Sequence, residues 1–178
     1  DGNLAQRNEA IVFEADAGEY GDTHVDINSS LITDPTNNVT YRGPKYGGLD
    51  SSAVIVNKPI YIFDKHTVLE NMSFKYTNNT GVGPNDTCTI KNCGFFGKGS
   101  YGNGYLVNAD GTEHVKFENC MFSLVPNVTG SIASLTNGGT IEFLNCTFIN
   151  DDFSIGGPHQ PFMAQAGDGK LIANNVVN

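Results

Sequence analysis

The sequence predicts an all-β fold in which short strands follow one another in stacked coils, and three observations support this prediction. A six-residue pattern recurs: apolar, any, Asn, small or sulfur-containing, any, aromatic or aliphatic. Its asparagines stand 21 to 29 residues apart, the length of one strand-rich coil rather than of a helical hairpin. The residues beside each Asn alternate between apolar and polar, which is the period-two signature of half-buried strands.

The pattern occurs at residues 69–74, 90–95, 117–122, 143–148 and 172–177. Asn tolerates a left-handed backbone at low energetic cost, so it suits a sharp bend between two strands. We therefore predict a ladder of bend asparagines on successive coils and an aromatic stack inside. The ladder consists of Asn71, Asn92, Asn119, Asn145 and Asn174, and the stack consists of Phe74, Phe95, Phe122 and Phe148.

One period, residues 105–124, reads as a strand at 105–109, a turn, a strand at 115–118, the bend Asn119 and a strand at 120–124. Three short strands leave no room for a helix. The next two periods repeat the plan. If neighbouring coils pair in parallel about 4.8 Å apart, equivalent residues lie above one another. The predicted fold is therefore a parallel β-helix.

The aliphatic-x-Asn-x-x-Phe bend resembles the repeat of the right-handed parallel β-helix, or pectate-lyase-like, superfamily. The resemblance covers residues from about 53 to the end of the sequence. It implies a right-handed solenoid with about five regular coils. It implies no single function, because that fold hosts lyases, hydrolases, phage tailspikes, adhesins and inert surface proteins.

Residues 1–52 differ from the rest, with many acids and frequent Gly and Pro. Only residues 10–13, 24–27 and 39–41 are strand-like. We expect irregular opening coils or an assembly arm at 1–52, and the regular β-helix at 53–178. Loops are expected at 76–86, 97–104, 125–130 and 151–161, where Gly, Asn and Pro are frequent.

Charge and composition restrict the partners and the location. The chain has 178 residues with 10 Lys and Arg against 19 Asp and Glu, a net charge of −9. Nucleic acids and anionic membranes are therefore poor partners. The sequence contains no apolar run near the roughly 20 residues that span a bilayer. Because it opens on Asp1 without a basic and apolar leader, it reads like a mature secreted, extracellular or cell-surface protein.

Seven Asn-x-Ser/Thr sequons support export, although an exposed solenoid rich in Asn, Ser and Thr is an alternative explanation. Asn71 and Asn145 belong to the ladder and are expected to stay unmodified. The sequon at Asn28 is not assigned to either group. The predicted N-glycosylation sites lie in loops: Asn38, Asn78, Asn85 and Asn127.

The four cysteines suggest disulfides in an exported chain, with three possible connectivities. We favour Cys88–Cys93 with Cys120–Cys146, which leaves no cysteine unpaired and joins only neighbouring coils. The alternative is a column of buried reduced thiols that act as small apolar fillers. Metal binding is weakly supported, because there is no CxxC pair and the four histidines are scattered.

No catalytic residues are predicted. A lyase of this fold needs a row of acids with a base beside it, but the expected outward positions are Lys91, Lys116, Glu118, Glu142 and Ala173. A hydrolase needs acids on successive coils, whereas the acids and bases here fall in one loop and the coil after it. No cofactor is expected other than calcium, for which Asp151 and Asp152 are weak candidates, and these also fit ordinary solvated loop acids.

The sequence therefore favours a non-catalytic extracellular structural protein. Neither end shows a capping sequence, and unpaired coil ends are templates for another chain. We expect the chain to assemble with itself, through the ends or edges of the β-helix, into an amyloid-like filament, sheath or surface layer. Few Lys, no Trp and many sequons suit a microbial cell-envelope subunit. The alternatives are a glycan-binding adhesin or tailspike-like module and, less favoured, a polysaccharide lyase or hydrolase.

Overall fold

The computed structural model describes residues 2–21, 25–28, 30–44, 53–57, 60–76, 82–84, 86–97, 107–110, 114–124, 133–136, 139–150, 163–165 and 170–175. Within these ranges the regular structure consists of strands and one short helix, α1 (Leu4–Arg7). No helix in the described ranges is long and apolar enough to cross a membrane.

The strands form three parallel sheets. Sheet 1 has the order β1 (Ile11–Glu14), β4 (Val39–Arg42), β7 (Thr67–Glu70), β10 (Cys88–Lys91), β13 (His114–Glu118), β16 (Thr140–Leu144) and β19 (Lys170–Asn174). Sheet 2 has the order β2 (Gly18–Tyr20), β5 (Val54–Val56), β8 (Met72–Tyr76), β11 (Gly94–Gly97), β14 (Met121–Leu124) and β17 (Thr147–Asn150). Sheet 3 has the order β3 (Val25–Ile27), β6 (Ile60–Ile62), β9 (Val82–Pro84), β12 (Val107–Asp110), β15 (Ala133–Thr136) and β18 (Met163–Gln165).

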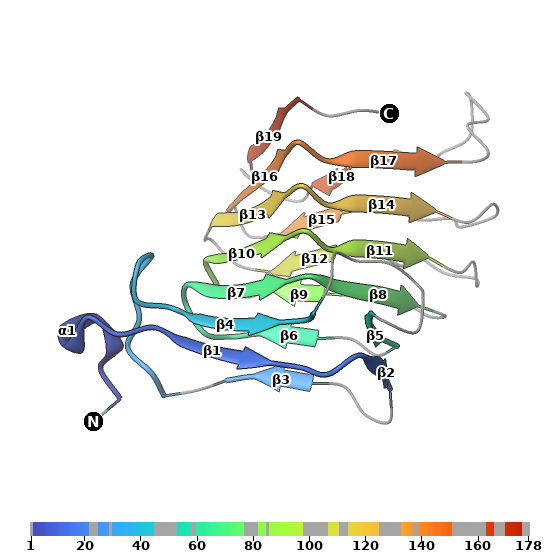
Figure 1. Ribbon diagram of the computed structural model, residues 1–178. Helices are drawn as coiled ribbons and strands as arrows, with labels where there is room; N and C mark the ends of the chain where they lie inside the picture. Colours follow the sequence, from blue (N-terminus) through green and yellow to red (C-terminus); the bar gives the residue numbers. More distant parts are fainter. Residues whose placement is uncertain are drawn as a thin grey trace.

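Consecutive strands enter the three sheets in rotation, so each set of three strands forms one layer, which we call a rung (Figure 1). Rung 1 is β1, β2 and β3, rung 6 is β16, β17 and β18, and β19 begins a seventh layer in sheet 1. Every pair of neighbouring strands in sheet 1 is parallel. The prediction of an all-β chain with parallel sheets is confirmed.

The expected boundary at residue 52 does not coincide with a change of architecture. In sheet 1, Ile11 pairs with Val39 and Val39 with Thr67, so the first two rungs share the register of the later ones. The bend positions of these rungs are Ala15 and Gly43, since the register places them in line with Asn71. Without Asn at the bend, the repeated pattern could not be seen in the sequence.

Asparagine occupies the bend between sheets 1 and 2 in the later rungs. Asn71, Asn92, Asn119 and Asn145 have φ between 52° and 59°, the left-handed region. The expected fifth member, Asn174, is wrong by one residue. β19 extends to Asn174, which pairs with Leu144, and Asn175 takes the bend with φ 51°. The same register places Ala173 opposite the inward Phe143, not on the outer face as expected.

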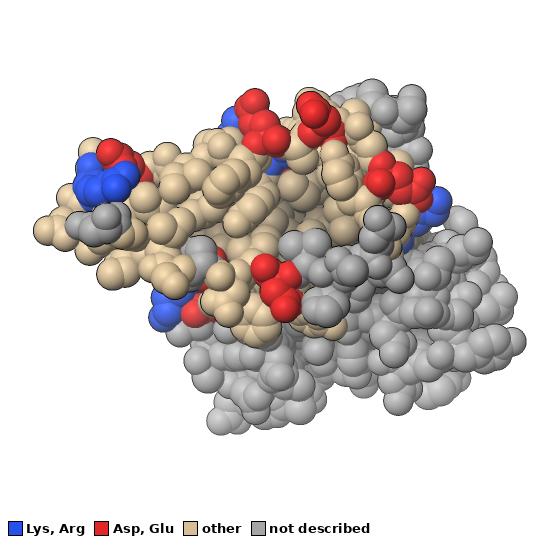
Figure 2. Space-filling view, turned by 90° about the horizontal axis from the view of Figure 1, so that it is seen from below, with Lys and Arg blue, Asp and Glu red and all other residues tan. Residues whose placement is uncertain are grey.

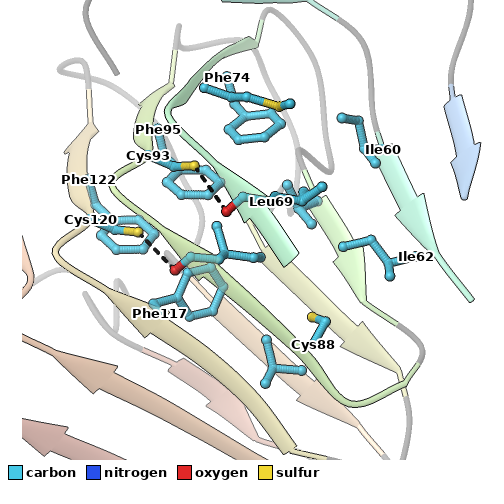
Figure 3. Packing of buried hydrophobic residues seen from close by; sticks show 14 of the residues in the cluster. Ile60, Ile62, Leu69, Phe74, Cys88, Cys93, Phe95, Phe117, Cys120 and Phe122 are labelled. Atoms are coloured by element: carbon cyan, nitrogen blue, oxygen red, sulfur yellow. Dashed lines mark hydrogen bonds between the residues drawn. The ribbon is translucent and has the colours of Figure 1, made fainter. Parts of the chain in front are cut away.

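The core lies between the sheets and is densely aromatic. Phe74, Phe95, Phe122 and Phe148 form a stack from rung 3 to rung 6, with successive ring centroids 4.9, 4.8 and 4.8 Å apart. Phe117 of sheet 1 meets Phe122 edge to face at 5.5 Å. Figure 3 shows rings of this stack one above another. Such geometry adds to the hydrophobic stabilisation of buried rings.

The four cysteines are buried and unpaired, so the expected disulfides are absent from this structure. Cys88 and Cys93 are too far apart to bond in this fold, because Cys88 begins β10 and Cys93 lies beyond its other end, after the bend at Asn92. The strand alone spans about 10 Å, which exceeds the reach of a disulfide. Figure 3 shows the two side chains well apart. Cys120 and Cys146 do lie on adjacent rungs, since Met121 pairs with Thr147.

The inward thiols are held by backbone carbonyl groups of the rung before. Cys120 Sγ donates to Ile90 O at 3.3 Å, and Cys146 Sγ donates to Phe117 O at 3.6 Å. Burial raises the pKa of the Cys120 thiol, and the hydrogen bond with Cys120 together with burial raises the pKa of Cys146. Both side chains therefore act as neutral, small core residues, the alternative to disulfides that the sequence allowed.

Candidate assembly surface at the first rung

Rung 1 lies at one end of the stack of described strands. In all three sheets its strand is the last in the order of the described strands. In β1, the amides of Ile11 and Ala15 donate to Asn38 O and Arg42 O of the second rung, at 3.0 and 2.8 Å. Since N–H and C=O groups of a strand alternate in direction, those of Val12 and Glu14 point toward the open edge.

Large apolar side chains are exposed on the same edge. Val12, Phe13 and Tyr20 are 46%, 50% and 46% exposed. Phe13 stands in the inward column of sheet 1 and stacks on Tyr41 with ring centroids 5.2 Å apart. In later rungs the residues of this column, such as Ile90 and Phe117, are fully buried. Phe13 is therefore a core residue with one side uncovered.

Beneath the edge lies a hollow with a volume of about 420 Å³, lined mainly by apolar residues of rungs 1 to 3. Its lining includes Ala15, Ile27, Tyr41, Val54, Val56 and Leu69. The register explains why this end of the core is underfilled. Val56 takes the position that Phe74 takes in the next rung, and Gly18 takes the position of Val54 and Met72. The aromatic stack therefore ends two rungs before the edge.

Acidic groups surround this end. Glu14, Asp16, Glu19 and Asp26 are all exposed, and residues 11–28 contain no Lys or Arg. Figure 2 views the molecule from this end and shows a mostly uncharged surface with separate acidic groups and a few basic groups around it. Arg42 lies 3.9 Å from Glu14 and partly compensates its charge. Two such ends brought face to face would still bring acidic groups such as Asp16 and Glu19 together, which is unfavourable. The surface is suited to a partner with a different charge pattern.

At the other end of sheet 1, β19 is the last described strand, and it pairs with β16 alone among the described strands. The amide of Lys170 donates to Gly139 O, and Asn174 O accepts from the amide of Asn145. The N–H and C=O groups of residues 171 and 173 therefore point away from β16. The side chains of Lys170, Ala173 and Asn174 are exposed. This strand projects one layer beyond β17 and β18.

The outer face of sheet 1 carries ion pairs. Glu70 lies between Arg42 at 2.8 Å and Lys91 at 3.4 Å, and His114 contacts Glu142 at 3.2 Å. Arg42 and Lys91 therefore both contact the Glu70 carboxylate. Within the described ranges no group of three or more His, Cys, Asp or Glu side chains is placed to hold a metal ion.

The bend asparagines form part of an amide ladder on the surface. Asn119 Nδ2 donates to Asn92 Oδ1 at 3.4 Å, and Asn71 Nδ2 donates to Gly43 O at 3.3 Å. The side chains of Asn119 and Asn145 are exposed, so the ladder lies on the outside of the bend.

The predicted glycosylation and calcium residues are only partly within the described structure. Asn38 is half-buried, its Nδ2 donates to Pro35 O at 3.2 Å, and its Oδ1 accepts from the Thr40 hydroxyl at 3.0 Å. Several other candidates lie outside the described residues: Asn78, Asn85, Asn127, Asp151 and Asp152.

Sequence reasoning did not single out Val12, Phe13 or Tyr20. A signal was present, because residues 10–13 are apolar on both faces of a strand next to an acid-rich stretch. A strand at the end of a parallel sheet has such a composition when both of its faces await partners.

Comparison with known proteins gives no relationship: no family model, no curated protein and no solved structure matches the chain.

Proposed function

We propose that the three sheets are the faces of a single right-handed parallel β-helix of the pectate-lyase-like type. The rotation of the chain through the three sheets supports this, as does the vertical alignment of equivalent residues. One buried hydrophobic cluster contains residues of all three sheets, among them Leu69, Phe74 and Ile62. A right-handed crossover is also the usual connection between parallel strands.

We further propose that the protein is a non-catalytic structural subunit that assembles with itself through the ends of this β-helix. The observation that carries this proposal is the rung-1 edge, where free backbone groups coincide with exposed Val12, Phe13 and Tyr20 above an apolar hollow. Soluble proteins usually cover or charge such edges. A further strand layer would pair the backbone groups and bury the apolar ones.

The assembly would be a filament, sheath or surface layer outside the cell. The acidic composition and the many sequons support an exported, glycosylated subunit, and a continuous cross-β core would resist heat and protease. The occupied ion pairs on sheet 1 support the absence of catalysis on that face. Calcium at Asp151 and Asp152 stays a prediction.

Electron microscopy of the purified protein in native buffer tests the proposal. We expect unbranched filaments or ordered layers from the wild-type chain. The Val12→Lys variant places a charge on the open edge and should abolish growth. Thr89→Lys is the matched control: it lies in the same outward column, but on the internal strand β10, and should assemble normally.

A second edge variant separates edge pairing from charge. The amide of Val12 points to the open edge, so Val12→Pro removes a donor that the isolated chain does not use. We expect a folded monomer that does not extend. If the wild-type chain stays monomeric at all concentrations, or if Val12→Lys and Val12→Pro assemble like wild type, the proposal is wrong.

A further inference from the structure

We propose that two copies join head to tail by parallel pairing of β19 of one copy with β1 of the next. The proposed register places residue 171 opposite Ile11, Ile172 opposite Val12, Ala173 opposite Phe13 and Asn174 opposite Glu14. This inference rests on the proposed self-assembly and adds its polarity and its register. Four separate features of the two edges support it.

The backbone directions fit parallel pairing. On β19 the groups of residues 171 and 173 face the free edge, and on β1 those of Val12 and Glu14 do. In a parallel pair, a residue whose backbone N–H and C=O groups face the neighbouring strand is aligned with a residue whose groups face away from it. Ile11 and Val39 are aligned in this way. Alignment of Ala173 with Phe13 meets this rule, whereas a shift of one residue breaks it.

The bends also align in this register. Ala15, Gly43, Asn71, Asn92, Asn119, Asn145 and Asn175 occupy one column, following the register of sheet 1. Placing Asn174 opposite Glu14 sets Asn175 above Ala15 of the next copy. A shift of two residues would keep the backbone pattern but place a bend against the middle of a strand. The column therefore selects one register.

The outward side chains of the two edges are complementary. The residues aligned with Val12 along sheet 1 form one column of outward-facing side chains. On β19 this column ends at Ile172. On the internal strands it contains Thr40, Val68, Thr89, Lys116 and Glu142. Four of these five internal residues are polar, whereas both end residues are apolar. Val12 is 46% exposed and Ile172 is half-buried. Pairing Ile172 with Val12 would remove both from water.

The inward side chains fit as well. Ala173 is small and exposed, and it follows Phe143 in the inward column of sheet 1. Phe13, at the other end of that column, is 50% exposed and stacks on Tyr41. In the joint, the free side of the Phe13 ring would cover Ala173. The small residue leaves space for the ring.

Charge sets the polarity. The joint places the neutral Asn174 amide, a hydrogen-bond donor, beside the exposed Glu14 carboxylate. Joining two rung-1 ends would instead oppose their acidic groups, which include Glu14, Asp16 and Glu19. Sheet 1 has seven described strands and the other sheets six, so β19 is the outermost described strand at its end. It is therefore the strand that meets β1 of the next copy in the proposed joint.

Cysteine cross-linking tests this register with four substitutions in two combinations. Val12→Cys with Ile172→Cys, and Glu14→Cys with Asn174→Cys, place the new thiols opposite each other at about 4.8 Å between Cα atoms. The exchanged pairs, Val12→Cys with Asn174→Cys and Glu14→Cys with Ile172→Cys, are offset by two residues and serve as matched controls. Oxidised glutathione is the oxidant: two thiols and one glutathione disulfide give one protein disulfide and two reduced glutathiones.

We expect the two pairs that the register aligns, Val12→Cys with Ile172→Cys and Glu14→Cys with Asn174→Cys, to form a ladder of multimers on denaturing gels. Reduction should return them to the monomer band. The exchanged pairs should stay monomeric on the same gels. Circular dichroism confirms folding, and either of the two aligned pairs suffices if the other fails to fold. Cross-linking by the exchanged pairs, dimers from Val12→Cys alone, or filaments without cross-linking would overturn the joint while leaving self-assembly intact. A wild-type chain that never assembles would instead overturn the proposed function.

Discussion

Asn175 Nδ2 donates a hydrogen bond to Oδ1 of Asn145, 30 residues earlier in the chain, at 2.7 Å. Both residues have a left-handed backbone at the bend that follows a strand of sheet 1. The same relationship holds between Asn119 and Asn92 at 3.4 Å. The bend asparagine therefore has two separable roles, a backbone role in the turn and a side-chain role between rungs.

Substitution of Asn119 separates these roles. Asn119 has φ 52°, which a residue with a Cβ adopts at a cost of about 1–2 kcal/mol. Asn119→Ala should therefore lower the free energy of unfolding by about 1 kcal/mol more than Asn119→Gly. Urea titration of both variants measures the difference. Equal stabilities of the two variants would show that the left-handed bend is not what selects Asn.

The aromatic stack should dominate core stability. Phe122 is fully buried between Phe95 and Phe148, each 4.8 Å away. Phe122→Ala should reduce the free energy of unfolding by about 3–5 kcal/mol, through lost burial and a cavity. Ile149 follows Phe148 on the neighbouring strand β17 and is 42% exposed. Ile149→Ala should therefore change the free energy of unfolding by about 0.5 kcal/mol or less. A small effect at Phe122 would contradict the shared core.

Gly43 is required at a bend that has no Asn. A Cβ at this position would lie 2.2 Å from the backbone oxygen of Asn71 in the next rung. Gly43→Ala should destabilise the fold by about 1–3 kcal/mol or more, because backbone atoms must move. Gly18→Ala is the control, since its nearest atom would be a Tyr20 ring carbon at 3.7 Å. Thermal unfolding of the two variants should differ clearly, and equal melting temperatures would contradict the register of rungs 2 and 3.

The buried thiols should make the protein less stable in alkali. Burial raises the pKa of Cys88 and Cys120 above the ordinary value of 9.0, and the contact with Cys120 together with burial does so for Cys146. Above this value the unfolded chain releases thiol protons that the folded chain keeps. Stability is therefore unaffected below about pH 9 and falls as the pH rises further.

Cys88→Val tests this linkage, because the same column already contains Val115 in the next rung. Above about pH 9, each removed thiol should reduce the slope of unfolding free energy by up to about 1.4 kcal/mol per pH unit. Denaturant titrations of wild type and variant across this range provide the slopes. Identical slopes would indicate that Cys88 ionises equally in the folded and unfolded chains.

The sequence predicted the later rungs well because their bends and cores use distinctive residues. Asn at a left-handed bend, followed by a sulfur-containing or small residue and an inward Phe, identifies two strands and the turn between them. One strand of sheet 3 was missed. β9, with the buried Val82, falls within the expected loop at 76–86, since three residues are too few for a periodic signal.

The errors have physical causes of the same kind. Rungs 1 and 2 bend at Ala15 and Gly43, which lack the Asn signal. The tandem Asn174 and Asn175 could fit the pattern in two ways, and only pairing with β16 decides between them. The Cys88–Cys93 pairing leaves no cysteine unpaired and joins only neighbouring coils, but an extended strand separates the two residues. The exposed rung-1 edge depends on which strands end a sheet, a property of the whole fold.

The axial repeat of native assemblies tests the central claim most directly. If β19 pairs with β1 of the next copy, the seven strands of sheet 1 predict one subunit per about 34 Å along the axis, with a strand spacing of about 4.8 Å. Cryo-electron microscopy of material in native buffer measures both distances. Filaments with this repeat would support end-to-end assembly of the β-helix. Monodisperse single chains, or strands running along the filament axis instead of across it, would contradict it.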